Sequence, residues 1–76
     1  MFEKVCSIIA GVLEVEPQTL SRESNSDTIP TWDSLNHWQI IEDIEQAFGV
    51  EFTMDEAVAF QNLGDILDSL SQTSKP

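Results

Sequence analysis

The feature that most constrains the fold is a periodic segment from Asp33 to Phe48, bounded by residues that start and stop helices. Asp33 can accept hydrogen bonds from first-turn amides, and its charge suits the positive end of the helix dipole. Gly49 and the apolar Val50 then form the pattern of a Schellman motif. A helix over 33–48 is therefore predicted, with these inward residues: Trp38, Ile41, Ile44 and Phe48, flanked by Ile40 and Ala47.

The outer face of this helix carries one apolar residue among polar ones. Steps of 100° per residue place Leu35, Gln39, Glu42 and Gln46 on one stripe opposite the core. A single exposed leucine ordinarily has no functional meaning. Leu35, however, directly follows a serine at the helix start, so we expect it to contact a partner.

Three further helices are expected. Residues 2–13 form an amphipathic helix that ends before Pro17, with an apolar face of Phe2, Val5, Cys6, Ile9, Val12 and Leu13. Thr53 and Glu56 fit a capping box that opens a short helix ending near Phe60. Asn62 caps the last helix, whose inward residues are Leu63, Ile66, Leu67 and Leu70, and residues 71–76 are expected to be a frayed tail.

The segment from Glu14 to Trp32 has no period and is mostly polar. A loop this long in a small domain is usually functional or disordered. Leu20, Ile29 and Trp32 are its expected anchors to the core. The fold class is therefore all-α: a four-helix bundle with a long first loop and a short third helix, without credible strand pairs.

Ser34 falls at the first helical position, hydroxyl outward, at the mouth of an anion site. A serine placed there is well suited to carry a phosphodiester. Asp33-Ser34-Leu35 at a helix start resembles the attachment motif of acyl carrier proteins. The resemblance covers nearly the whole chain, long first loop included, and implies a carrier domain over 1–70 and a flexible tail over 71–76.

The resemblance implies a discrete carrier with no catalysis of its own. A phosphopantetheinyl transferase would attach 4′-phosphopantetheine from coenzyme A to Ser34. A ligase or acyltransferase would load the thiol with an acyl group as a thioester, and downstream enzymes with basic docking patches would use it. The residues expected to take part in partner recognition are Asp33, Leu35, Asn36, Gln39, Glu42 and Glu45.

Departures from the family pattern suggest a specialised biosynthetic pathway. Asn36, Gln39 and Gln46 are neutral at positions where the family often has acids. Bulky Trp38, Phe52 and Phe60 favour a short or polar cargo over a long fatty chain. Two alternatives stay open: an aminoacyl or D-alanyl carrier, and an acidic helical interaction domain in which Ser34 is only a cap.

Asp33, Ser34 and His37 together invite comparison with a catalytic triad. A triad also needs an oxyanion hole and an acid on the far side of the imidazole, and Asp33 is better used as a cap. His37 is therefore expected to be a hydrogen-bonded histidine at the edge of the core, with a place beside the phosphopantetheine arm as the alternative.

The balance of acidic and basic residues limits the classes of partner that the chain can bind. Fourteen acidic residues against three basic ones give a net charge of −11, which disfavours nucleic acid and anionic membranes. A lone cysteine, Cys6, excludes an internal disulfide and is expected to be a buried apolar residue. The apolar run from Ile8 to Leu13 is too short to span a bilayer. We expect a cytoplasmic monomer without a signal peptide or metal site.

Overall fold

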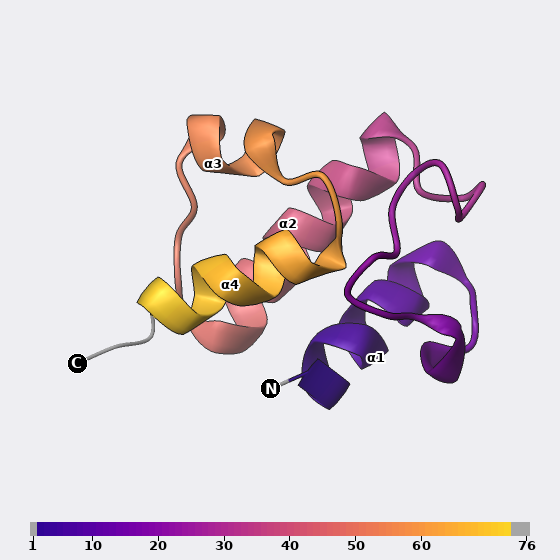
Figure 1. Ribbon diagram of the computed structural model, residues 1–76. Helices are drawn as coiled ribbons and strands as arrows, with labels where there is room; N and C mark the ends of the chain where they lie inside the picture. Colours follow the sequence, from indigo (N-terminus) through magenta and orange to yellow (C-terminus); the bar gives the residue numbers. More distant parts are fainter. Residues whose placement is uncertain (1, 74–76) are drawn as a thin grey trace.

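The computed structural model describes residues 2–73, which form four α-helices and one turn of 3₁₀ helix, with no strand among them. The helices are α1 (Phe2–Leu13), α2 (Ser34–Phe48), α3 (Met54–Ala59) and α4 (Leu63–Thr73), and the turn is η1 (Pro17–Thr19). In Figure 1, α4 crosses in front of α2, and α3 lies towards the end of the molecule where α2 begins. The predicted all-α architecture, with its long first loop and short third helix, is confirmed.

Helix α1 presents most of the predicted apolar face to the core. Its buried residues are Val5, Cys6, Ile9, Ala10 and Leu13. Phe2 was predicted to face inward, but its side chain is 42% exposed. It is the first residue of the helix and lies at a surface hollow shared with Arg22 and Leu67, where it is only partly covered. The helix closes through Glu14, whose φ of 59° is left-handed, and through a Val15 amide that donates to the Ala10 carbonyl.

Helix α2 has the predicted ends. Asp33 is the N-cap and Gly49 adopts a left-handed φ of 66°. The amides of Gly49 and Val50 both donate to the Glu45 carbonyl, at 2.9 and 3.2 Å. Both helix termini therefore follow from local sequence.

The inward face of α2 is rotated from the predicted one. Ile40, Ile41 and Ile44 are buried, whereas Trp38 is 41% exposed and Ala47 is exposed. The prediction that Trp38 belongs to the core is therefore wrong. The buried face centres on Ile40 and Ile44, and Trp38 lies about 100° or more around the helix from that centre.

The long loop packs onto the core through the three predicted anchors. Leu20, Ile29 and Trp32 are all buried, at 6%, 9% and 5% exposure. Polar contacts fix the same segment, since the Thr31 hydroxyl donates to the Leu13 carbonyl at 2.8 Å. The segment that precedes Ser34 is therefore held against α1 rather than free.

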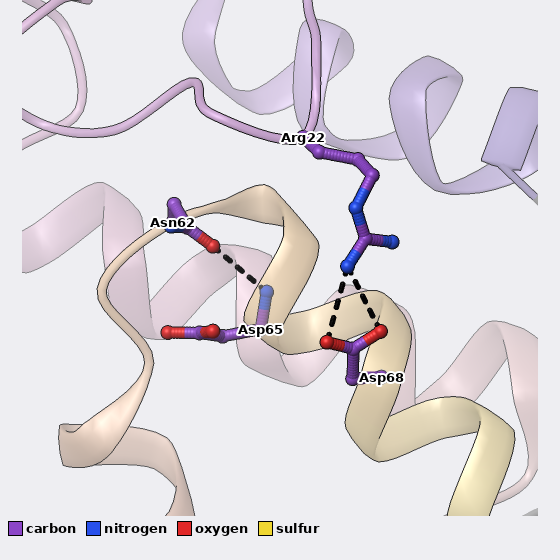
Figure 2. Close-up of polar contacts among 4 residues, drawn as sticks. All are labelled: Arg22, Asn62, Asp65 and Asp68. Carbon is purple, nitrogen blue, oxygen red and sulfur yellow. Dashed lines mark hydrogen bonds and ion pairs between the residues drawn. The ribbon is translucent and has the colours of Figure 1, made fainter.

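The loop also completes the start of α4. The amides of Leu63 and Gly64 donate to the carbonyls of Ser24 and Arg22, at 3.0 and 2.8 Å. Figure 2 shows the Asp65 amide donating to the Asn62 side chain at 2.8 Å, the predicted cap. Three of the first-turn amides, which have no partner within the helix, thus gain acceptors.

An ion pair accompanies these backbone contacts. Arg22 Nη2 lies 3.0 and 3.1 Å from the two carboxylate oxygens of Asp68, about one helical turn beyond Asp65 (Figure 2). Both side chains are more than half exposed, so the pair contributes little by itself. The backbone hydrogen bonds carry the docking of the loop on α4.

The last two helices follow the sequence closely. The capping box of Thr53 and Glu56 is present, and α3 ends before Phe60 as predicted. Helix α4 buries the predicted residues and extends to Thr73, three residues into the segment predicted as a tail. Residues 74–76 of that tail lie outside the described residues. Within residues 2–73, no helix has both the length and the apolar character needed to cross a membrane.

Candidate functional site

Ser34 is exposed at the first residue of α2, and the backbone before it is fixed. The Asp33 carboxylate accepts from the Asn36 amide at 2.9 Å, which confirms the predicted cap. The Asn36 side chain in turn donates to the Thr31 carbonyl at 2.8 Å. These contacts hold the Ser34 hydroxyl at the open, positive end of the helix, where a phosphate group is stabilised.

A groove of about 520 Å³ opens beside Ser34, between the start of α2 and the end of α3. Its lining residues are Ser26, Trp32, Asp33, Ser34, His37, Trp38, Val58, Phe60 and Gln61. Trp38 and Val58 are 41% and 62% exposed, so the groove presents apolar surface to solvent. A flexible group attached to Ser34 would therefore find an apolar surface within reach.

His37 uses both ring nitrogens within the chain. Trp32 Nε1 donates to His37 Nδ1 at 3.1 Å, and His37 Nε2 lies 2.9 Å from the Ala57 carbonyl. An indole N–H only donates and a carbonyl only accepts, so Nδ1 is the acceptor and Nε2 the donor in these two contacts. The expectation of a hydrogen-bonded histidine at the edge of the core is confirmed. Neither nitrogen is available as a base for Ser34, which removes the triad.

The residues predicted for partner recognition divide into two groups. Leu35 is 80% exposed, and Gln39 and Glu42 are exposed along the same face of α2. Asn36 is instead engaged with the loop, as described above, and Glu45 accepts from the Phe52 amide at 2.7 Å. Both side chains hold the local structure together, which leaves Leu35, Gln39 and Glu42 as the outward-facing set beside Asp33.

Helix α3 adds apolar surface that the sequence did not predict. Met54 and Val58 are 68% and 62% exposed. A helix of six residues is too short for its periodicity to reveal which side faces out. The position of α3 against α2, rather than any motif, brings Val58 into the groove with Trp38.

Cys6 and the acidic residues do not form a second reactive centre. Cys6 is 4% exposed, burial raises the pKa of its thiol, and the nearby Glu3 carboxylate raises it further. A protonated, buried thiol is a poor nucleophile, as predicted. Across residues 2–73, no group of three or more histidine, cysteine, aspartate or glutamate side chains is placed to hold a metal ion.

Comparison with known proteins identifies the family. A family model described as a phosphopantetheine attachment site matches residues 3–70. An acyl carrier protein of Guillardia theta is 33% identical over 72 residues, covering 95% of this chain and 89% of that protein. This chain belongs to the acyl carrier protein family. Another relative, an acyl carrier protein of Thermosynechococcus vestitus, is 32% identical over 71 residues, covering 93% and 88%.

The fold agrees with that membership. A Mycobacterium tuberculosis chain assigned as an acyl carrier protein superposes with a TM-score of 0.84, covering 93% of this chain and 95% of that one. Their sequences are only 20% identical, so this comparison supports the fold alone. Members of the family are carriers rather than enzymes, and their cofactor is covalently attached 4′-phosphopantetheine. Family membership implies interaction with a phosphopantetheinyl transferase and with acyl-handling enzymes.

The site has the properties that such an attachment needs. The hydroxyl of Ser34 is exposed, and the helix terminus under it favours an anionic ester. The adjoining groove offers apolar surface from Trp38 and Val58 to the rest of the arm. The residues present therefore fit the group.

Proposed function

We propose that Ser34 carries the 4′-phosphopantetheine arm, and that the chain holds acyl intermediates on it as thioesters for partner enzymes of a specialised pathway. The observation that carries this proposal is the exposed Ser34 hydroxyl at the start of α2, between a fixed aspartate cap and an open groove. Ser34 also lies within the segment that matches the attachment-site family.

The attachment is a phosphoryl transfer to the serine oxygen. Ser34 Oγ forms a new ester bond to the phosphorus next to the pantetheine half of coenzyme A. The bond from that phosphorus to the oxygen bridging to the nucleotide breaks, so that adenosine 3′,5′-bisphosphate leaves. The hydroxyl proton passes to a base of the transferase.

After attachment, this chain supplies position and charge. The phosphodiester at Ser34 is an anion at the positive end of α2, where the helix dipole stabilises it. The terminal thiol of the arm supplies the thioester chemistry. Tethering raises the effective concentration of the cargo at each docked enzyme. The four contacts among Thr31, Leu13, Asp33 and Asn36 keep the attachment point rigid.

Recognition would rest on the outward face of α2. Leu35 supplies an apolar contact, and Gln39 and Glu42 continue the same exposed stripe. With a net charge of −11, the chain suits enzymes whose docking patches are basic. Asn36 and Glu45 would act through the local backbone that they hold.

The packing supports a short or polar cargo. Ile40, Ile44, Leu63 and Ile66 are all at 0% exposure, so these core side chains of α2 and α4 offer no surface that opens to a tethered group. Beyond them the Phe52 and Phe60 rings meet edge-on, 5.2 Å apart. A tethered group would therefore lie along the outer groove, where a long alkyl chain would stay exposed to water. An aminoacyl cargo fits this description equally, and the loading enzyme distinguishes the two.

The decisive experiment is modification of the purified chain. With coenzyme A, magnesium and a broad-specificity phosphopantetheinyl transferase, the intact mass should rise by one phosphopantetheine, and fragmentation should place it on Ser34. Ser34→Ala should keep its helical circular dichroism and gain no mass. Ser7→Ala, at an exposed serine of α1 that does not line the groove, is a matched control and should be modified normally. Wild-type protein that is folded but unmodified by several such transferases would overturn the proposal.

A further inference from the structure

His37 joins three elements of the fold beside Ser34. It belongs to the first turns of α2, it accepts from Trp32 of the long loop, and it donates to the Ala57 carbonyl of α3. The ring is half-buried between these partners and also meets the Trp38 ring edge-on, 6.0 Å between centroids. A single imidazole therefore connects segments that are far apart along the chain.

One partner of His37 lines the groove, and the other lies next to a lining residue. Trp32 lines it from the loop, and Val58, next to Ala57, lines it from α3. Helix α3 has only six residues, and its cap is internal, between Thr53 and Glu56. Among the polar contacts of residues 2–73, the bond to His37 is the one that ties the α3 backbone to α2. The His37 ring therefore adds a polar link between α2 and α3 to the apolar packing of Ala57.

We propose that His37 is a positioning residue that links Trp32 of the long loop to the α3 backbone beside the groove, and that a proton added to its Nδ1 breaks the hydrogen bond from Trp32 Nε1. The neutral ring has one acceptor and one donor, which match an indole N–H and a carbonyl. A proton added to Nδ1 turns the acceptor into a second donor, directly opposite Trp32 Nε1. The Nε2 bond to Ala57 survives as a charge-assisted bond.

Few other charges face the ring. Of the residues that line the groove, Asp33 is the one other titratable group, and its carboxylate is engaged by the Asn36 amide. The α3 side of the groove presents Val58, the loop side presents Trp32 and Ser26, and the Ala57 carbonyl meets the ring at Nε2. The proposed role of His37 does not depend on modification of Ser34, and it goes beyond the carrier function.

The test uses the unmodified full chain carrying Trp38→Phe. This change leaves Trp32 as the sole indole, and His37 is the sole histidine. The indole N–H proton resonance is followed by NMR from about pH 8 to about pH 5, the range in which histidine takes up a proton. We expect the resonance to move upfield along a single titration curve as Nδ1 is lost as an acceptor, and acrylamide quenching of Trp32 fluorescence to rise with it.

The matched variant is His37→Gln in the same background. Its amide offers one acceptor and one donor but does not titrate in this range. We expect it to stay folded with an indole resonance that does not move with pH. A Trp32 resonance that is unchanged by pH in the folded histidine-containing chain would overturn the proposal. The same titration curve in the glutamine variant would also overturn it, since the proton would then belong to a carboxylate such as Asp33. Neither result bears on whether Ser34 is modified.

Discussion

The carbonyl oxygen of Arg22 accepts a hydrogen bond from the Gly64 amide at 2.8 Å, so a residue of the long loop caps the last helix. A Cβ atom at position 64 would lie 3.1 Å from that oxygen and 3.3 Å from the Arg22 Cβ. This is a close approach of backbone to backbone, which only glycine permits without a shift. It couples the conformation of the loop to the register of α4.

Gly64→Ala should therefore destabilise the domain. Crowding against the Arg22 backbone should lower the free energy of unfolding by about 1–3 kcal/mol. The higher helix propensity of alanine should offset this by up to about 1 kcal/mol. We expect a net loss of about 1–2 kcal/mol in the free energy of urea unfolding. Gly11→Ala in α1 is the control, because nothing lies within 4 Å of its added Cβ. It should be neutral or stabilising, and equal effects at both positions would contradict the crowding argument.

The ion pair beside this contact should matter much less. Arg22 and Asp68 are 52% and 62% exposed, and exposed pairs contribute about 0–1 kcal/mol. We expect Asp68→Asn to lower the free energy of unfolding by less than Gly64→Ala does. If Asp68→Asn proved the more damaging change, the side chains rather than the backbone would hold the loop on α4.

Leu35→Ala should separate recognition from folding. Its side chain is 80% exposed, and surface changes of this kind usually alter stability by less than about 0.5 kcal/mol. The thermal midpoint should stay close to that of the wild type while transferase modification slows. Phe2→Ala removes an exposed apolar residue at the start of α1, away from the groove, and should leave that rate unchanged. Equal slowing by both variants would count against a recognition surface on α2.

Added salt should stabilise the fold. A net charge of −11 on a small surface destabilises the folded state through self-repulsion, which ions screen within about 10 Å at about 0.1 M. The melting temperature should rise with sodium chloride and with millimolar magnesium. Glu51→Gln, an exposed change, should raise melting at low salt and have a smaller effect at high salt. Melting that is insensitive to both salts would exclude repulsion as a main destabilising term.

Alkaline pH should weaken the fold through Cys6. Burial raises the pKa of the Cys6 thiol, so the folded chain binds this proton more tightly than the unfolded chain. The contribution to stability is complete below the unfolded-state pKa and declines as pH rises towards the folded value. Urea unfolding at neutral and alkaline pH measures it. In Cys6→Ala the decline should be smaller, and an unchanged pH dependence in that variant would assign the effect elsewhere.

Local sequence determined where the helices begin and end. The Asp33 cap, the Gly49 terminus and the Thr53–Glu56 capping box each depend on residues within one or two turns, and all are present. The position of Ser34 in the candidate site is likewise set by local sequence, because Ser34 directly follows the Asp33 cap. Side chains that hydrogen-bond to the backbone of residues close in sequence can be predicted without knowledge of the tertiary structure.

Tertiary structure decided which flank of α2 is buried and what surrounds Ser34. Trp38 is the larger apolar residue, yet His37 takes the more enclosed place, because Trp32 and Ala57 supply its hydrogen bonds from 5 and 20 residues away. Hydrophobicity alone would place the tryptophan inward, but a polar ring can be enclosed where hydrogen-bond partners satisfy both its nitrogens. The same holds for Gly64, whose need for glycine comes from a loop residue that is distant in sequence. Sequence periodicity records the helix itself, and it contains no information about partners that only the folded chain brings together.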